Sequence, residues 1–247
     1  MNTRFGTFII AMAAVGLLGG ASLATAGPGA QRNALKATQI ENSGEVAPND
    51  PIWESARPLY LPLIFINDPV WMNELKPSQR EIYMDTEGDK GGRLEARAVF
   101  DATQIAIRLS WEDATENRVM NDTDDFPDGA SVAFDARMMC HMGRMSDPQN
   151  IWNMWYWRAD DDRSENLLSA GVGTTTKVPT ANLRAESLWE DGHWYVVLTR
   201  PLGSSDPDTQ VDLSKGNDAI RFARWDGGRN QRNGKKWITM SAHLELK

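Results

Sequence analysis

Short stretches in which apolar and polar residues alternate recur from Asp50 to the end of the chain, and they limit its possible folds more than any other feature. Each is rich in Val, Ile, Trp, Tyr and Phe and is bounded by Gly, Pro, Asp or Asn, as β-strands are. No long stretch keeps the 3.6-residue period of a helix, and NDPVWMNELKPSQREIYM offers only short helical turns. The alternating stretches are PLYLPLIFI, LEARAVFD, QIAIRLSWED, GASVAFDAR, NIWNMWYWRA, RAESLWEDG, HWYVVLTRPL, AIRFARWDGG and WITMSAHLEL.

Many short strands that do not alternate with helices favour antiparallel sheets packed face to face. The sequence therefore predicts an all-β fold, an antiparallel β-sandwich with a few short helices. No internal repeat or linker divides residues 50–247, so we expect them to form one domain. A chain of about 220 residues is long enough to bury a sizeable core.

The N-terminal segment has the pattern of a secretory signal peptide. Arg4 precedes the apolar run FIIAMAAVGLLGGASLATA, which ends in the cleavage pattern Ala24-Thr25-Ala26. We expect residues 1–26 to be removed near Ala26 and the mature protein to be periplasmic. No other segment approaches the roughly 20 apolar residues that span a bilayer. Residues 27–49 are polar and predict an extended leader, in which ALKATQIENSG could hold a strand.

Charge and cysteine content exclude several classes of protein. The chain has 26 basic and 34 acidic residues, and loss of Arg4 leaves a net charge near −9. An acidic protein is a poor partner for nucleic acid or anionic membranes. Cys140 is the one cysteine, so no intramolecular disulfide can form and the fold depends on its core.

The stretch MMCHMGRM, residues 138–145, concentrates soft metal ligands beside an aromatic strand, NIWNMWYW. A c-type haem needs Cys-x-x-Cys-His, and in Arg137-Met138-Met139-Cys140-His141 an arginine stands in place of the first cysteine. Thioethers, thiolate and imidazole also suit Cu(I), so a Met-rich copper-binding protein is an alternative. Methionines that merely fill a core are a third reading, but Gly143 and Asp147 indicate an exposed loop.

A non-covalent haem accounts for more of these features than the other readings. It needs two axial ligands and an apolar pocket with aromatic walls. In an extended strand, Trp152 and Met154 share one face of NIWNMWYW, whereas Trp155 and Trp157 share the other. Either face could line a flat ring while the other is buried between the sheets.

Three blocks together resemble the haem b-binding gamma subunits of periplasmic molybdenum enzymes of the dimethyl sulfoxide reductase family. That group includes ethylbenzene and dimethyl sulfide dehydrogenases and selenate and chlorate reductases, and nitrite-oxidising relatives carry similar subunits. The likeness covers roughly residues 45–247. The blocks are DDFPDGASVAF, HMG followed by NIWNMWYWRA, and ARWDGGRNQRNGKKWITMSAHLEL.

This resemblance implies a methionine and a lysine as the axial ligands of one haem b. The Met-Gly block places the methionine at Met142, and the Gly-x-Lys block places the lysine at Lys236. An amine binds iron only when neutral, and burial beside a cation favours that form. The haem pocket is expected to include Trp152, Met154, Trp155 and Trp157. The alternative ligands are Lys235, His141, Met145, Met139 and His243.

The resemblance also implies the role and the partners. It predicts a non-catalytic electron-transfer subunit that works with a molybdenum alpha subunit, an iron-sulfur beta subunit and a soluble c-type cytochrome. No nucleophile elbow, catalytic triad or phosphate-binding loop appears in the sequence. The acidic stretches NDTDDFPDG and RADDDRSEN do not match calcium loops. A secreted carbohydrate-binding β-sandwich module is the alternative, because DATQIAIRLSWEDAT and HWYVVLTRPL resemble such modules.

Overall fold

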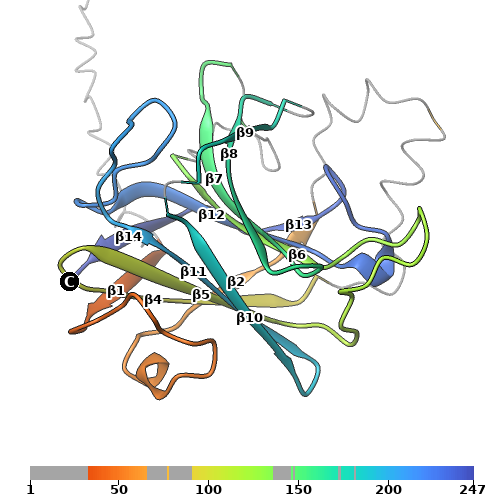
Figure 1. The fold of residues 1–247 in the computed structure, drawn as a ribbon, viewed down its shortest axis with the longest axis horizontal. Coiled ribbons are helices and arrows are strands. Elements are labelled where there is room, and N and C mark those ends of the chain that lie inside the picture. Colours follow the sequence, from red (N-terminus) through yellow and green to blue (C-terminus); the bar gives the residue numbers. More distant parts are fainter. Residues whose placement is uncertain are drawn as a thin grey trace, which may run out of the picture. The chain divides into compact units, whose positions relative to one another are not determined.

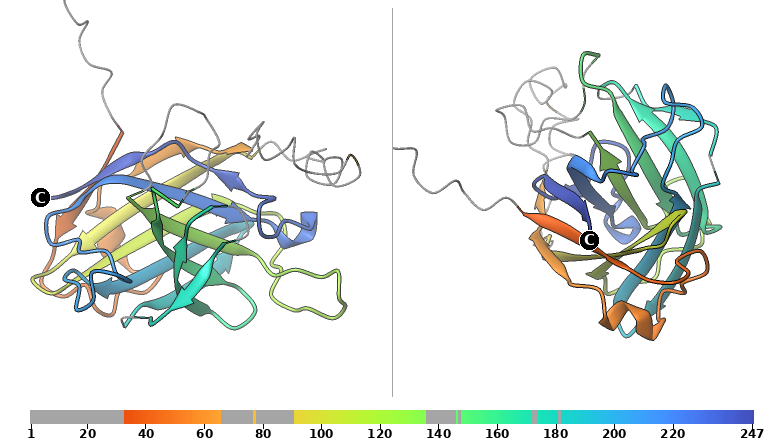
Figure 2. Two further views of the ribbon diagram at one scale, coloured as in Figure 1. Left: turned by 90° about the horizontal axis from the view of Figure 1, so that it is seen from above. Right: turned by 90° about the vertical axis from the view of Figure 1, so that its left-hand side faces the viewer.

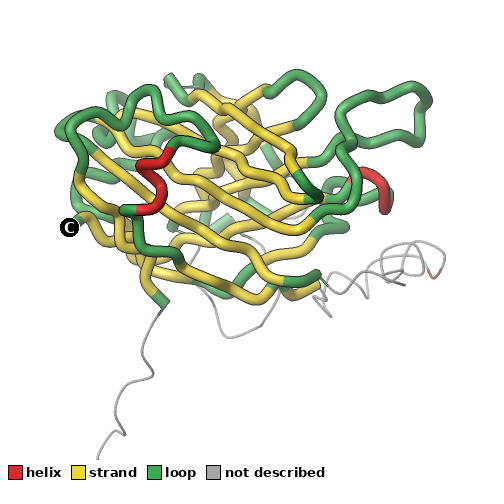
Figure 3. Tube along the Cα trace, turned by 90° about the horizontal axis from the view of Figure 1, so that it is seen from below, coloured by secondary structure: helices red, strands yellow, loops and turns green. Residues whose placement is uncertain are grey.

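The computed structural model describes residues 33–65, 77, 91–135, 146, 148–171, 174–180 and 182–247. The described residues belong to one compact unit, Arg32–Lys247. Strands dominate it (Figure 3), and its named helical elements are two short 3-10 helices, η1 (Pro51–Glu54) and η2 (Gly227–Arg229). No helix in the described part of the chain is both long and apolar enough to span a bilayer.

Fourteen strands in the described residues join through hydrogen bonds into one sheet. Its order is β10-β11-β5-β4-β1-β14-β12-β6-β7-β8-β9, with β2 paired to β4, β13 to β12 and β3 to β13. The strands are β1 (Ala34–Gln39), β2 (Leu59–Pro62), β3 (Ile64–Phe65), β4 (Arg93–Phe100), β5 (Gln104–Glu112), β6 (Gly129–Phe134), β7 (Trp152–Arg158), β8 (Arg163–Ser169), β9 (Thr176–Val178), β10 (Arg184–Glu190), β11 (His193–Pro201), β12 (Asn217–Trp225), β13 (Trp237–Ile238) and β14 (Ala242–Leu246).

The sheet folds over itself into two layers (Figures 1 and 2). The first layer contains β2, β4, β5, β11 and β10, and the second contains β12, β6, β7, β8 and β9 with β13 and β3. Alternate residues of both layers point inward and are buried, as the period of an extended strand requires. The prediction of an all-β sandwich is confirmed.

Tryptophans from both layers meet in the core. Trp157 of β7 lies edge-on to Trp194 of β11, with ring centroids 5.0 Å apart, and to Trp111 of β5 at 6.3 Å. Trp157 Nε1 donates to Asp162 Oδ1 at 3.0 Å, so its polar atom is satisfied. These three rings are among the largest buried side chains and join the two layers.

One part of the strand pairing differs from an antiparallel sandwich. β1 lies between β4 and β14 and runs parallel to both. It falls in the segment assigned to the leader, within the run ALKATQIENSG where a strand is allowed. Leu35 and Ala37 alternate with half-buried residues and enter the core, which explains why this short segment is held there. The stretch with helical turns, 67–84, lies outside the described residues apart from Pro77, and the signal peptide lies wholly outside them.

Candidate functional site

The two faces of β7 have different surroundings. Trp155 and Trp157 point into the core between the layers. Trp152, Met154 and Tyr156 point the opposite way, toward the outside of the second layer, yet they are also buried or nearly so. Trp152 and Met154 are 6% and 7% exposed. An outward face of a sheet is usually solvated, so the burial of these side chains sets this face apart.

Neighbouring strands extend this buried outward surface, which we name the outer apolar face. Trp152 and Met154 pack with Ala133 of β6 and Leu167 of β8. Tyr156 lies edge-on to Trp225 of β12, with ring centroids 5.2 Å apart. Burial raises the pKa of the Tyr156 hydroxyl to about 12. The face comprises Ile64, Ala133, Trp152, Met154, Tyr156, Leu167, Ala223, Trp225 and Ile238.

Lys236 lies at one side of the outer apolar face. After Trp225 the chain turns through η2 and returns as β13, which pairs antiparallel with β12. Lys236 directly precedes β13, and its Nζ lies 4.9 Å from the centre of the Trp225 ring. Nζ also donates to the Asn233 carbonyl at 3.3 Å, and Trp225 Nε1 donates to the same carbonyl at 3.1 Å. Lys236 is 6% exposed.

Burial gives Lys236 unusual acid-base behaviour for a lysine. Desolvation, with a smaller effect from the Arg221 charge, lowers the pKa of its ammonium group to about 7. Near neutral pH, Lys236 is therefore a neutral amine in a large fraction of the protein molecules. A neutral amine has a lone pair, which a metal ion requires of a nitrogen ligand.

Arg221 brings a second basic group to the same face. Arg221, Ala223 and Trp225 are alternate residues of β12, so their side chains point to the same, outward side of the sheet. Its guanidinium lies 5.4 Å from the centre of the Trp152 ring, and its Nε donates to the Thr239 carbonyl at 3.2 Å. Burial lowers the Arg221 pKa to about 10. Sequence reasoning missed Arg221, although its spacing from Trp225 could have indicated it.

The other predicted ligands divide into two groups. Lys235 is buried beside Lys236, and its backbone N–H bonds to the Arg232 carbonyl. His243 lies in β14, half-buried, beside Ala34 of β1 and in a surface pocket with Lys215. The remaining candidates are outside the described residues: Met139, His141, Met142 and Met145, together with Cys140.

The described residues do fix where the methionine-rich segment is attached. β6 ends at Phe134, which pairs with Asn153 of β7. Past the segment, Ser146 Oγ donates to Ser169 Oγ at 2.7 Å, and Ser169 pairs with Trp152. The described residues on either side of the segment, Phe134 and Ser146, therefore both lie at the end of the sheet that carries Trp152. The buried Trp152 Nε1 has no hydrogen-bond partner among the described residues.

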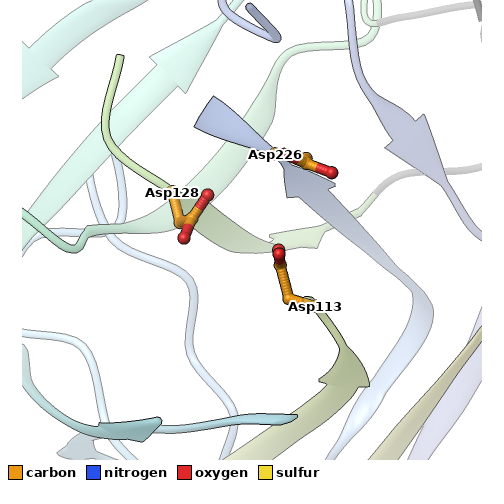
Figure 4. Close-up of side chains that lie close together, drawn as sticks. All are labelled: Asp113, Asp128 and Asp226. Atoms are coloured by element: carbon orange, nitrogen blue, oxygen red, sulfur yellow. The ribbon is translucent and has the colours of Figure 1, made fainter. Parts of the chain in front are cut away.

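A second cluster in the structure was not predicted from the sequence. Asp113 follows β5, Asp128 precedes β6 and Asp226 follows β12, and the three carboxylates gather in a buried group (Figure 4). Burial, reinforced by the neighbouring carboxylates, raises the pKa of Asp113 to about 7 and of Asp128 to about 6. The residues come from distant parts of the chain, and no motif links them.

A sequence model described as ethylbenzene dehydrogenase matches residues 50–179 and 169–237, most of the chain. The chain belongs to the ethylbenzene dehydrogenase family. This confirms the resemblance seen in the three sequence blocks. The match includes the Met-Gly block, the aromatic strand β7 and Lys236.

Three named proteins are similar in sequence to part of this chain. The chain is 42% identical over 149 residues to the gamma subunit of chlorate reductase from Ideonella dechloratans, covering 60% of this chain and 62% of that protein. It is 32% identical over 156 residues to a protein of Haloferax mediterranei named as a respiratory nitrate reductase heme subunit, covering 61% and 55%. It is 33% identical over 144 residues to the dimethylsulfide dehydrogenase gamma subunit of Rhodovulum sulfidophilum, covering 55% and 53%. The matches thus span just over half of each relative's length.

Among solved structures, a family 9 carbohydrate-binding module from Caldicellulosiruptor kristjanssonii is similar in fold to this chain. The comparison covers 87% of this chain and 96% of the module, with 9% identity and a TM-score of 0.49. A likeness at this level carries no argument about ligand or function.

Proposed function

We propose that this protein is the electron-transfer subunit of a periplasmic molybdenum oxidoreductase and holds one non-covalent haem b on the outer apolar face. The observation that carries the proposal is the buried amine of Lys236 beside a sheet face lined by Trp152, Met154 and Trp225. The names of the relatives, two gamma subunits and one heme subunit, support it.

The residues of this face fit the requirements of a haem. A haem needs an apolar pocket and protein ligands for its iron, and the outer apolar face would supply one wall of that pocket. Lys236 supplies a nitrogen ligand that burial has already made easy to deprotonate. In this proposal Met142 is the second ligand, because the described residues that flank its segment lie at the end of the sheet that carries Trp152. Of the four expected pocket residues, Trp152 and Met154 would line the ring. Trp155 and Trp157 point into the core and would support β7 from there.

The chain's contribution would be ligation, exclusion of water and electrostatics. A bound haem supplies reversible one-electron chemistry at its iron. Lys236 and Met142 would hold the iron in place, and a methionine ligand raises its reduction potential. Arg221 would place a buried positive charge close to Lys236, which favours the reduced state of a nearby redox group because that state is more negative.

The partners and the location follow from the same proposal. The protein would be exported, lose its signal peptide near Ala26 and act in the periplasm. It would pass electrons between an iron-sulfur beta subunit, joined to a molybdenum alpha subunit, and a soluble c-type cytochrome. It would have no catalytic role itself, because the substrate is transformed in another polypeptide.

Spectroscopy of the purified protein tests the cofactor. We expect a Soret band and one haem b per chain, extractable into acidified organic solvent because the haem is not covalently bound. A pyridine haemochrome of c type would contradict non-covalent haem b. A colourless protein that binds Cu(I) or a glycan would contradict the proposal. Such a result would favour the copper-binding protein or the carbohydrate-binding module instead.

The methionine ligand has its own test. Met142→Ala is expected to weaken haem retention by at least about tenfold and to change the visible spectrum, since a lost axial bond alters the iron's electronic state. Met139→Ala and Met145→Ala should leave the spectrum unchanged, as should Met120→Ala, a control at an exposed position. If Met139→Ala or Met145→Ala alone changed the spectrum, that residue would be the ligand in place of Met142.

A further inference from the structure

The buried aspartate cluster lies where three strand ends of the two layers meet. Asp113 follows β5 of the first layer, whereas Asp128 and Asp226 adjoin β6 and β12 of the second. One oxygen from each residue lies within 4.8 Å of the others. Asp128 is fully buried, and Asp113 and Asp226 are 6% and 8% exposed. In Figure 4, Asp113 points from the end of its strand toward the other two.

Hydrogen bonds satisfy the Asp128 carboxylate but leave one oxygen of Asp113 without a donor. Asp128 accepts from Asn117 N at 2.8 Å, Trp194 Nε1 at 3.0 Å and Gly227 N at 2.8 Å. Asp113 Oδ1 accepts from Thr115 N at 3.2 Å. Asp113 Oδ2 is buried and accepts no hydrogen bond from the residues that the structure describes. A buried acceptor without a donor is costly, so Asp113 Oδ2 itself indicates a missing partner.

The charges around the cluster indicate the nature of that partner. Arg224, with a side chain only 5% exposed, has its Nη1 3.7 Å from Asp226 Oδ2. Arg229 lies at the same distance but is 43% exposed, so solvent screens it. A bound cation would favour the ionised form of all three carboxylates, and beside one buried guanidinium these would carry an excess of two negative charges. A divalent cation would neutralise that excess.

We propose that Asp113, Asp128 and Asp226 bind one calcium ion. Carboxylate oxygens without nitrogen or sulfur are the donors of a hard cation. Calcium is held at about 2.3–2.6 Å from its oxygens, so two oxygens on one ion lie up to about 5 Å apart, which accommodates the spacing here. Water completes the coordination. This site is separate from the haem proposal and does not depend on it.

A calcium ion here would stabilise the turn that carries Lys236. Asp226 begins that turn, because its carboxylate accepts from Arg229 N at 3.1 Å and its carbonyl accepts from Gln231 N at 3.0 Å. Asp128 holds the same turn through Gly227 N. The ion would thus connect the end of β5 to the turn between β12 and β13, and so join the two layers at the edge of the outer apolar face.

Thermal unfolding of the full chain, with whatever cofactor it retains on purification, tests the site. After treatment with chelator, we expect Ca²⁺ to raise the Tm by about 5–10 °C at free concentrations about 100-fold above Kd. Terbium is expected to show luminescence when tryptophan is excited, because the Trp194 indole bonds directly to Asp128. Ca²⁺ should displace that signal.

Asp113→Asn provides the matched variant, because it keeps the shape and removes one charge. It should lower calcium affinity at least about tenfold, whereas Asp124→Asn, at an exposed site nearby, should leave it unchanged. Without calcium, Asp113→Asn should unfold at or above the wild-type temperature, since an amide can donate to the neighbouring carboxylates. Wild-type protein whose Tm ignores Ca²⁺ would overturn the proposal, as would an Asp113→Asn variant that retains the full response.

Discussion

Lys236→Leu is expected to abolish stable haem binding and, in the haem-free protein, to raise stability at pH 7 by about 2–4 kcal/mol. The amine's lone pair is the proposed ligand, and leucine has none. The gain in stability has a separate origin, because burial lowers the Lys236 pKa from 10.5 to about 7. The wild-type fold must therefore either bury an ammonium or give up a proton that the unfolded chain keeps.

The pH dependence identifies this origin. Above about pH 10.5 the Lys236 amine is neutral in both states, and it costs the fold no protonation energy. As the pH falls from 10.5 to about 7, the unfolded chain binds the proton while the folded chain does not, so wild-type stability falls. Below about pH 7 both states are protonated and the loss is constant. The advantage of Lys236→Leu should therefore be largest at and below pH 7 and small at pH 10.5.

Urea unfolding of wild type and variant at pH 7 and pH 10 measures this difference, and the Soret band of the purified proteins measures haem retention. Lys177→Leu is the control, because this lysine is 57% exposed and pairs with Glu165. Lys235→Leu distinguishes the rival ligand and should keep the haem. An unchanged spectrum in Lys236→Leu would remove Lys236 from the site, whatever the stability data show.

Much of the fold could be predicted from the sequence because most strands alternate strongly. Each of the nine stretches named from the sequence contains a strand, and QIAIRLSWED, for example, becomes β5. β8 was missed because RSENLLS begins with polar residues in an acidic stretch. The structure explains its polarity, since Asn166 of β8 is buried and its side chain bonds to Asn153, Pro179 and Thr209. A buried amide network satisfies groups that a hydropathy pattern treats as solvent-exposed.

Less of the candidate site could be predicted, because its parts are brought together by the topology. The alternation in NIWNMWYW separates Trp152 from Trp157 but does not say which face is the core. That choice depends on Trp111 and Trp194 of the opposite layer, which pack on Trp157. Lys236 was chosen by resemblance, and its burial against Trp225 now gives an independent physical reason. The aspartate cluster could not be predicted, since it joins three strand ends across two layers.

The two faces of β7 lead to opposite expectations for two tryptophan substitutions. Trp157→Ala should destabilise the fold by about 3–5 kcal/mol, because it empties the centre of the core. Trp157 is fully buried against Trp111 and Trp194. For a chain of this size, such a loss lowers the Tm by roughly 10 °C. Haem that remains bound should keep its wild-type spectrum, since Trp157 faces away from the outer apolar face.

Trp152→Ala should have the reverse profile. Trp152 packs outside the core with Ala133, Met154 and Leu167, and the Arg221 guanidinium lies over its ring. Its loss removes part of the proposed haem surface, so haem affinity should fall at least about tenfold while the haem-free Tm drops less than in Trp157→Ala. Thermal unfolding and titration of haem into haem-free protein separate the two effects. Equal losses of haem affinity in both variants would mean that the haem does not lie on the outer apolar face. In that case a substitution in the core would weaken haem binding as strongly as one at the proposed surface.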